Sequence, residues 1–127
     1  MSKSKELPSV HLERMLNLSE KLSEAGRLNS QEKLAEDFWF GMGISRAFNL
    51  VGRLSSKLPD EIKLRYPDVP WKNMEWMRGL TIHDGADANP TRVWEAMTTD
   101  IPRLIPILQK ALAVESQSEN EESQKGK

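Results

Sequence analysis

The sequence predicts an all-α protein, folded as an antiparallel helical bundle. Apolar residues recur at helical spacing along most of the chain, and no stretch alternates apolar and polar residues cleanly enough for a strand. Prolines and glycines divide the periodic segments into two long and several shorter helices. Short connections of this kind favour antiparallel neighbours.

The two longest predicted helices come first. A stripe of leucines and methionine predicts a helix over residues 9–25, with Gly26 as a left-handed C-cap. Asn29 can cap the next helix, which apolar spacing extends to residue 57. Three glycines interrupt this second helix, which suits either a close approach by another helix or a kink: Gly41, Gly43 and Gly52.

Proline positions organise the second half of the chain. Pro67 and Pro70 enforce an extended connection, because the residue before a proline avoids the helical conformation. Pro70 is also placed to begin a helix over residues 71–83. Asn89, before a further proline, begins a short helix through residue 97. A last helix begins with Asp100 as its cap and is kinked at Pro106.

Length and charge predict one helical domain over residues 1–114 and a disordered polar tail over residues 115–127. The tail holds four acidic residues, two lysines and no large apolar residue, so it cannot bury enough surface to order itself. The remaining body carries 16 basic and 15 acidic residues, a net charge of +1. Composition alone therefore gives no case for nucleic-acid binding.

Several function classes are excluded by composition. With no cysteine, the chain has no disulfide scaffold, thiol nucleophile or sulfur-based zinc site. Its two histidines, His11 and His83, lie far apart, and we expect neither metal nor cofactor; His11 is assigned to the surface or to a packed first helix. The longest uncharged stretch has eight residues, too few for a membrane helix, and the N-terminus is polar. A cytoplasmic protein is expected.

The candidate chemistry centres on His83. A histidine at a helix end can simply stabilise the helix C-terminus. Arg78 lies five residues earlier, about 140° around an ideal helix, so a shared site is easier to assemble from two copies of the chain. Asp84 can orient the imidazole or do nothing. Arg46 and Arg53, seven residues apart on one side of a helix, can line an RNA groove or form a solvated face.

Several short motifs resemble those of the HepT-like proteins in the HEPN superfamily. The resemblance spans about residues 28–112. It rests on a proline–tryptophan pair, a methionine–arginine pair, an arginine five residues before a histidine, and a later valine–tryptophan pair followed by an acidic–aliphatic–proline triplet: Pro70-Trp71, Met77-Arg78, Arg78 with His83, Val93-Trp94 and Asp100-Ile101-Pro102.

This resemblance implies a fold with a four-helix core plus short helices. It also implies a toxin of a type VII-like toxin–antitoxin module, partnered by a small MNT-type nucleotidyltransferase antitoxin. It implies a homodimeric, metal-independent endoribonuclease that acts on RNA and not on DNA. His83 would be the general acid/base, because an imidazole titrates near neutral pH. Arg78 would be the phosphate clamp, because a guanidinium can bind two phosphate oxygens as charge builds. We expect residues 38–43 and the helix over 71–83 to contribute to the dimer interface.

Two positions depart from the family pattern. Gly79 stands where HEPN nucleases commonly have a polar residue after the arginine. Gly85 stands where HepT proteins usually have the tyrosine that accepts AMP from the antitoxin, and the chain's one tyrosine, Tyr66, lies far upstream. Two hypotheses therefore stay open. The chain is an RNase silenced by direct contact, or a weakened or inactive bundle that serves as a binding partner of the antitoxin.

Overall fold

The computed structural model describes residues 6–80 and 89–125, and over these ranges it contains helices and no strand. The all-α prediction is confirmed. The elements in chain order, with a 3-10 turn η1 and a π-helical turn η3, are α1 (Pro8–Leu28), α2 (Gln31–Glu36), α3 (Phe38–Lys57), α4 (Asp60–Arg65), α5 (Trp71–Trp76), η1 (Met77–Gly79), α6 (Pro90–Glu95), η3 (Ala96–Asp100) and α7 (Ile101–Lys125).

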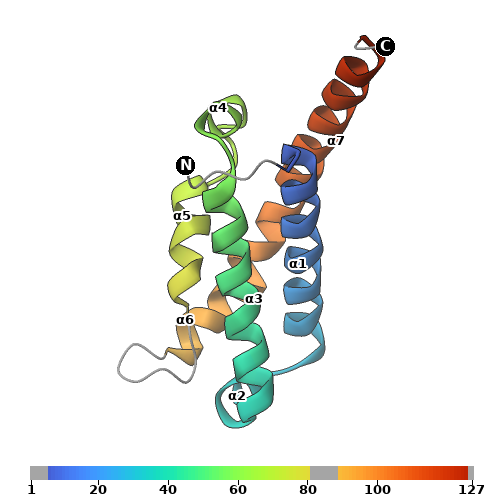
Figure 1. Ribbon diagram of the computed structural model, residues 1–127. Helices are drawn as coiled ribbons and strands as arrows, with labels where there is room; N and C mark the ends of the chain where they lie inside the picture. The colour runs from blue at the N-terminus through green and yellow to red at the C-terminus, as the bar shows by residue number, and fades with distance from the viewer. Residues whose placement is uncertain (1–5, 81–88, 126–127) are drawn as a thin grey trace.

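The helices form an up-and-down bundle (Figure 1). α1 and α3 run antiparallel, α5 returns beside α3, and α7 rises on the other side and extends past the end of the bundle. α1 packs against α3 and α7, whereas α3 packs against α5 and η1. α3 is therefore the helix on which the segment that carries Arg78 packs.

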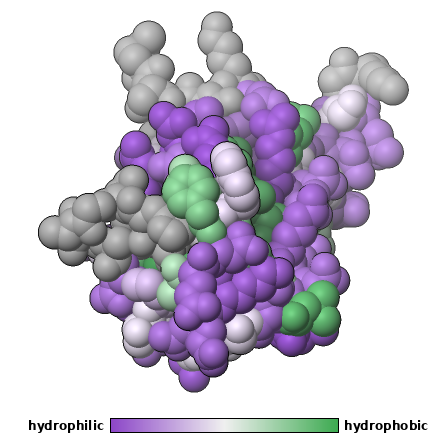
Figure 2. Space-filling model, turned by 90° about the horizontal axis from the view of Figure 1, so that it is seen from below, coloured by the Kyte–Doolittle hydropathy of each residue, from purple (hydrophilic) through white to green (hydrophobic). Residues whose placement is uncertain are grey.

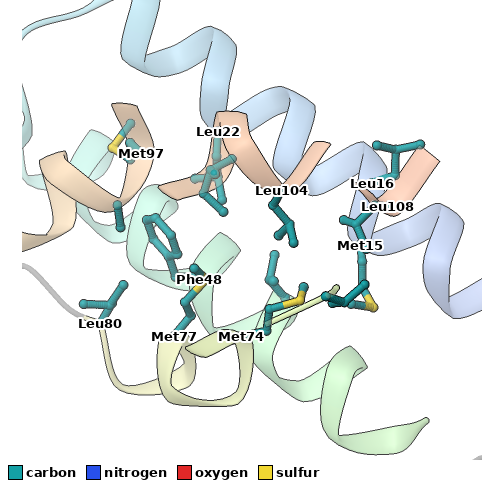
Figure 3. Packing of buried hydrophobic residues seen from close by; sticks show 14 of the residues in the cluster. Met15, Leu16, Leu22, Phe48, Met74, Met77, Leu80, Met97, Leu104 and Leu108 are labelled. Carbon is teal, nitrogen blue, oxygen red and sulfur yellow. The ribbon is translucent and has the colours of Figure 1, made fainter. Parts of the chain in front are cut away.

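The core is built from leucines and an unusual share of methionines (Figure 3). Met15, Phe48, Met74 and Met97 have no exposed side-chain surface, and they come from four different elements. Unbranched methionine side chains fill the irregular space between short helices. His11 is also buried in α1, so of its two predicted settings the packed helix is the observed one; burial lowers the pKa of its imidazole.

The prediction that Gly26 ends the first helix is wrong. Gly26 lies inside α1, which continues to Leu28, and it is buried against η3. A β-carbon there would lie 3.1 Å from the Thr98 side chain and 3.7 Å from Met97. The glycine serves close packing of α1 on η3 instead of a left-handed turn.

The predicted second helix is divided into α2 and α3. Ser30, not Asn29, caps α2 by accepting a hydrogen bond from the Lys33 N–H at 3.1 Å. Asn29 instead donates its side-chain amide to the last turn of α1. Asp37 ends α2 and caps α3 by accepting from the Phe40 N–H at 3.0 Å. Because the Asp37 carboxylate accepts from a free N–H group at the start of α3, the break between the two helices costs little free energy.

The predicted helix over residues 71–83 ends sooner. α5 stops at Trp76, η1 covers the next three residues, and Leu80 is extended with its side chain buried in the core. Gly79 is a poor helix former, and burying Leu80 requires the chain to leave the helical path. The ideal-helix angle of 140° between Arg78 and His83 therefore does not apply, and it no longer supports a site built from two copies.

The last helix does not begin at a cap on Asp100. η3 joins α6 to α7 without interruption, and the Asp100 carboxylate instead pairs with Arg92 at 3.1 Å. At the other end of this segment, Asn89 caps α6 as predicted by accepting from the Arg92 N–H.

The structure also differs from the predicted disorder after residue 114, because α7 continues to Lys125. Glu115 is buried and accepts hydrogen bonds from the Tyr66 hydroxyl and, at 2.6 Å, from Arg65. Glu119 accepts from the Ser9 N–H at 3.1 Å. Composition suggested disorder because it does not reveal that these carboxylates have partners in the bundle. Among the described residues, no helix is both long enough and apolar enough to cross a membrane.

Candidate functional site

Arg78 is held at the surface by buried neighbours on either side of it. Met77 and Leu80 both point into the core, and Met74 anchors the preceding turn of α5 (Figure 3). The Leu80 N–H donates to the Met77 carbonyl at 3.1 Å, which closes η1. The turn is therefore fixed from inside, while the Arg78 side chain is exposed.

Gly52 is a residue of α3 on which η1 packs closely. A β-carbon at Gly52 would lie 2.2 Å from Arg78 Cγ, 2.8 Å from the Arg78 nitrogen and 2.9 Å from the Met74 carbonyl oxygen. Only a residue without a side chain permits α3 and η1 to come this close. Of the two readings of the helix glycines, close approach is the one that Gly52 satisfies.

Asn49 of α3 forms hydrogen bonds with Arg78 of η1 and with Arg46 of its own helix. Its side-chain amide donates to the Arg78 carbonyl oxygen at 3.4 Å, and its side-chain oxygen accepts from Arg46 Nη1 at 2.9 Å. Arg53 lies one turn further along α3, on the side of Arg46, and is exposed. The structure thus links Arg46 with Arg78 through Asn49, and places Arg53 on the same side of α3.

The other predicted site residues cannot be placed. His83, Asp84 and Gly85 lie outside the described residues. Within the described ranges, no three acidic or histidine side chains gather closely enough to hold a metal ion.

A known family model covers most of the chain. The model of the family described as "Ribonuclease HepT-like" matches residues 15–111 of the chain, from the middle of α1 to the middle of α7. The chain belongs to this HepT-like family.

Three relatives of this HepT-like chain illustrate the similarity. "Putative RNase TTE0752" of Caldanaerobacter subterraneus subsp. tengcongensis is 30% identical over 97 residues, 76% of this chain and 87% of that protein. "Probable ribonuclease HepT" of Thermococcus cleftensis is 31% identical over 61 residues, 48% of this chain and 56% of that protein. "Putative RNase MJ1216" of Methanocaldococcus jannaschii is 28% identical over 78 residues, 61% and 64% of the two chains. No solved structure matches the chain.

Two residues beside Arg78, Asn49 and Gly52, were not recognised from the sequence as parts of the candidate site. Asn49 carries a detectable signal, since it lies three residues after Arg46 and four before Arg53, on the same side of the helix. Gly52 was noted for close approach, but the sequence does not say which segment approaches. Only the packing of η1 on α3 identifies Arg78 as its neighbour.

The aromatic residues of this HepT-like chain divide into buried and exposed groups. Trp71 packs against the core and donates its indole N–H to two backbone carbonyls, as expected of a packing anchor. Trp76 is not such an anchor, because half of it is exposed and the Arg92 guanidinium stacks over its ring at 4.8 Å. Phe38 and Trp39 are 50% and 79% exposed at the start of α3. Figure 2, a view from the α2 end, shows apolar groups dispersed among hydrophilic side chains.

Proposed function

We propose that this chain is a metal-independent endoribonuclease and the toxin of a toxin–antitoxin module, acting in the cytoplasm. Family membership and the names of its relatives support RNA cleavage as the activity. The observation that carries the proposal is the setting of Arg78. Its side chain is exposed, its backbone is seated on Gly52, and it makes no ion pair with a described residue. Such an arginine is available to an anionic ligand.

The proposed reaction is an intramolecular transfer of the phosphoryl group from the 5′-oxygen to the 2′-oxygen of RNA. His83 accepts the proton of a ribose 2′-hydroxyl, and the 2′-oxygen attacks the adjacent phosphorus. The bond from phosphorus to the 5′-oxygen breaks, and the protonated imidazole returns a proton to that leaving oxygen. The Arg78 guanidinium binds the non-bridging oxygens as their negative charge increases. The products are a 2′,3′-cyclic phosphate end and a 5′-hydroxyl end.

Cleavage assays on purified variants test this proposal. We expect wild type to cleave a labelled single-stranded RNA with EDTA present, and Arg78→Ala and His83→Ala each to lower kcat/KM by about 100-fold or more. Arg27→Gln is the control, because Arg27 is an exposed arginine at the far end of α1. Circular dichroism establishes that each variant is folded. If folded wild type leaves RNA intact, the chain is instead the inactive binding partner; if EDTA alone abolishes cleavage, metal independence is wrong.

We further propose that the active form is a homodimer. The exposed Phe38 and Trp39, with Met42 at 42% exposure, leave apolar surface uncovered at the start of α3. Mixing the two inactive variants in the same assay tests whether each site combines Arg78 of one copy with His83 of the other. Co-expressed Arg78→Ala and His83→Ala chains then recover part of the activity. A mixture that forms dimers and stays inactive would place both residues within one chain.

We propose that the MNT-type antitoxin inhibits by direct contact over Arg78 and not by transfer of AMP to tyrosine. Gly85 offers no hydroxyl, and the hydroxyl of Tyr66 donates to the buried carboxylate of Glu115. Burial, followed by this hydrogen bond, raises the pKa of Tyr66 to about 12, which makes its phenolate scarce at neutral pH. Both effects make Tyr66 a poor nucleophile toward a nucleotide.

Intact-mass spectrometry of the protein co-expressed with the neighbouring nucleotidyltransferase gene checks this expectation. We expect an unmodified mass together with a stable complex on gel filtration. Co-expression with Glu115→Ala, which removes the acceptor of the Tyr66 hydroxyl, is the matched comparison. An AMP adduct on the wild-type chain would overturn inhibition by contact alone.

A further inference from the structure

α3 carries an unbalanced positive charge. Its 20 residues include no Asp or Glu, whereas Arg46, Arg53 and Lys57 are basic and exposed. The net charge of the whole chain is −1, so this local excess is invisible in the overall composition. A helix side with one sign of charge attracts ligands of the opposite sign.

The basic residues nearest η1 are arranged along one side of α3. Arg46 and Arg53 are seven residues apart, which is about 20° from two full turns and about 10 Å along the helix axis. Asn49 lies between them and is bonded at both ends, to the Arg46 guanidinium and to the Arg78 carbonyl oxygen. The α3 arginine row is therefore connected to the turn that carries Arg78.

These arginines differ from others that have ion-pair partners. Arg14, Arg65 and Arg92 each lie within 3.1 Å of a Glu carboxylate oxygen. Over the part of the chain that the structure describes, neither Arg46 nor Arg53 forms an ion pair, and their side chains point to solvent. Since Asn49 engages Arg46 through a neutral oxygen, the full charge of that guanidinium stays available.

We propose that Arg46 and Arg53 bind the phosphodiester backbone of single-stranded RNA and extend the substrate site away from Arg78, with Asn49 as a positioning residue. The proposal rests on the proposed ribonuclease function. Phosphate contacts from arginines fix the register of a strand without reading its sequence. A flexible single strand can follow the exposed helix and still rotate the reacting 2′-oxygen into line, which a base-paired strand resists. Asn49 holds Arg46 at a set place relative to Arg78, so a phosphate on Arg46 and the reacting phosphate keep a constant spacing.

Salt-dependent binding tests the proposal. In the His83→Ala background, which prevents cleavage, fluorescence anisotropy follows a labelled single-stranded RNA of about twelve nucleotides at about 50–200 mM KCl. Each of Arg46→Gln and Arg53→Gln is expected to reduce the slope of log K against log salt by about 0.7, and the double variant by about 1.4. Asn49→Ala removes no charge, so it should weaken binding with a smaller change in slope. Arg27 is exposed and forms no ion pair with the residues that the structure describes, so Arg27→Gln controls for the loss of one positive charge elsewhere.

The outcomes separate this proposal from the ribonuclease proposal. An unchanged slope in the double variant would overturn the proposal that RNA binds along α3, even if wild type cleaves RNA. An equal reduction of the slope in Arg27→Gln would do the same. A reduced slope in a protein that never cleaves RNA supports the surface and rejects the nuclease. Equal reductions with duplex RNA, bound as tightly as the single strand, would contradict the choice of single-stranded RNA. In cleavage assays the double variant should raise KM and leave kcat nearly unchanged, whereas a disturbed fold would lower kcat as well.

Discussion

Replacing Gly52 with alanine is expected to lower the free energy of unfolding by about 2–3 kcal/mol, the upper part of the range typical of overpacking in a well-packed interior. The new methyl group would lie 2.8 Å from the Arg78 nitrogen and 2.9 Å from the Met74 carbonyl oxygen, both backbone atoms. Such atoms cannot rotate away, so η1 must move off α3. Arg78 moves with it, and activity should fall more than the loss of folded protein explains. Urea titrations, with kcat/KM measured on the folded fraction, provide both quantities.

Gly43→Ala is the matched control for this substitution. Gly43 lies in the same helix, and a β-carbon there would meet nothing within 4 Å. Alanine's higher helix propensity should therefore stabilise the folded chain by up to about 1 kcal/mol. Equal effects of the two substitutions would mean that helix propensity governs both, and that Arg78 is not seated on Gly52.

Ending the chain after Val114 is expected to destabilise it by about 2–3 kcal/mol, although composition predicts that the removed residues are a dispensable tail. The truncation removes Glu115, which accepts hydrogen bonds from Tyr66 and Arg65, and Glu119, which accepts from Ser9. One hydrogen bond to a charged group contributes about 1.5–3 kcal/mol. The expected loss corresponds to about one such bond, that of the half-buried Tyr66 hydroxyl, because solvent screens the pair made by the partly exposed Arg65. Thermal and urea unfolding measure the loss.

Two further variants identify which residues cause this loss of stability. Ending the chain after Asn120 removes residues 121–124, which are exposed, and the three residues after them, and should change stability by less than about 0.5 kcal/mol. Glu115→Ala in the full-length chain should reproduce most of the loss, because it leaves the half-buried Tyr66 hydroxyl without its acceptor. If the chain that ends after Val114 unfolds like wild type, the last turns of α7 contribute nothing to the bundle.

The sequence alone was sufficient for the helical class and for locating the candidate arginine. Apolar spacing is a local property of a helix, so α1, α5 and α6 begin within a residue or two of their predicted starts. The pattern around Pro70, Arg78 and Val93 was also sufficient to find the family, which residues 15–111 confirm. These features depend on neighbours in sequence.

Helix ends and partners were decided only by tertiary structure. Asp37 divides one apolar pattern into two helices, and burial of Leu80 ends α5 and η1 short of the predicted boundary. Glu115 lies in a polar segment, yet it is buried because Arg65 and Tyr66 lie across from it, 50 and 49 residues earlier in the chain. The same holds for Gly52, whose missing side chain has meaning only once η1 packs against it. Sequence periodicity determines which face of a helix is apolar, but the free energy of each contact depends on which group, distant in the chain, lies opposite.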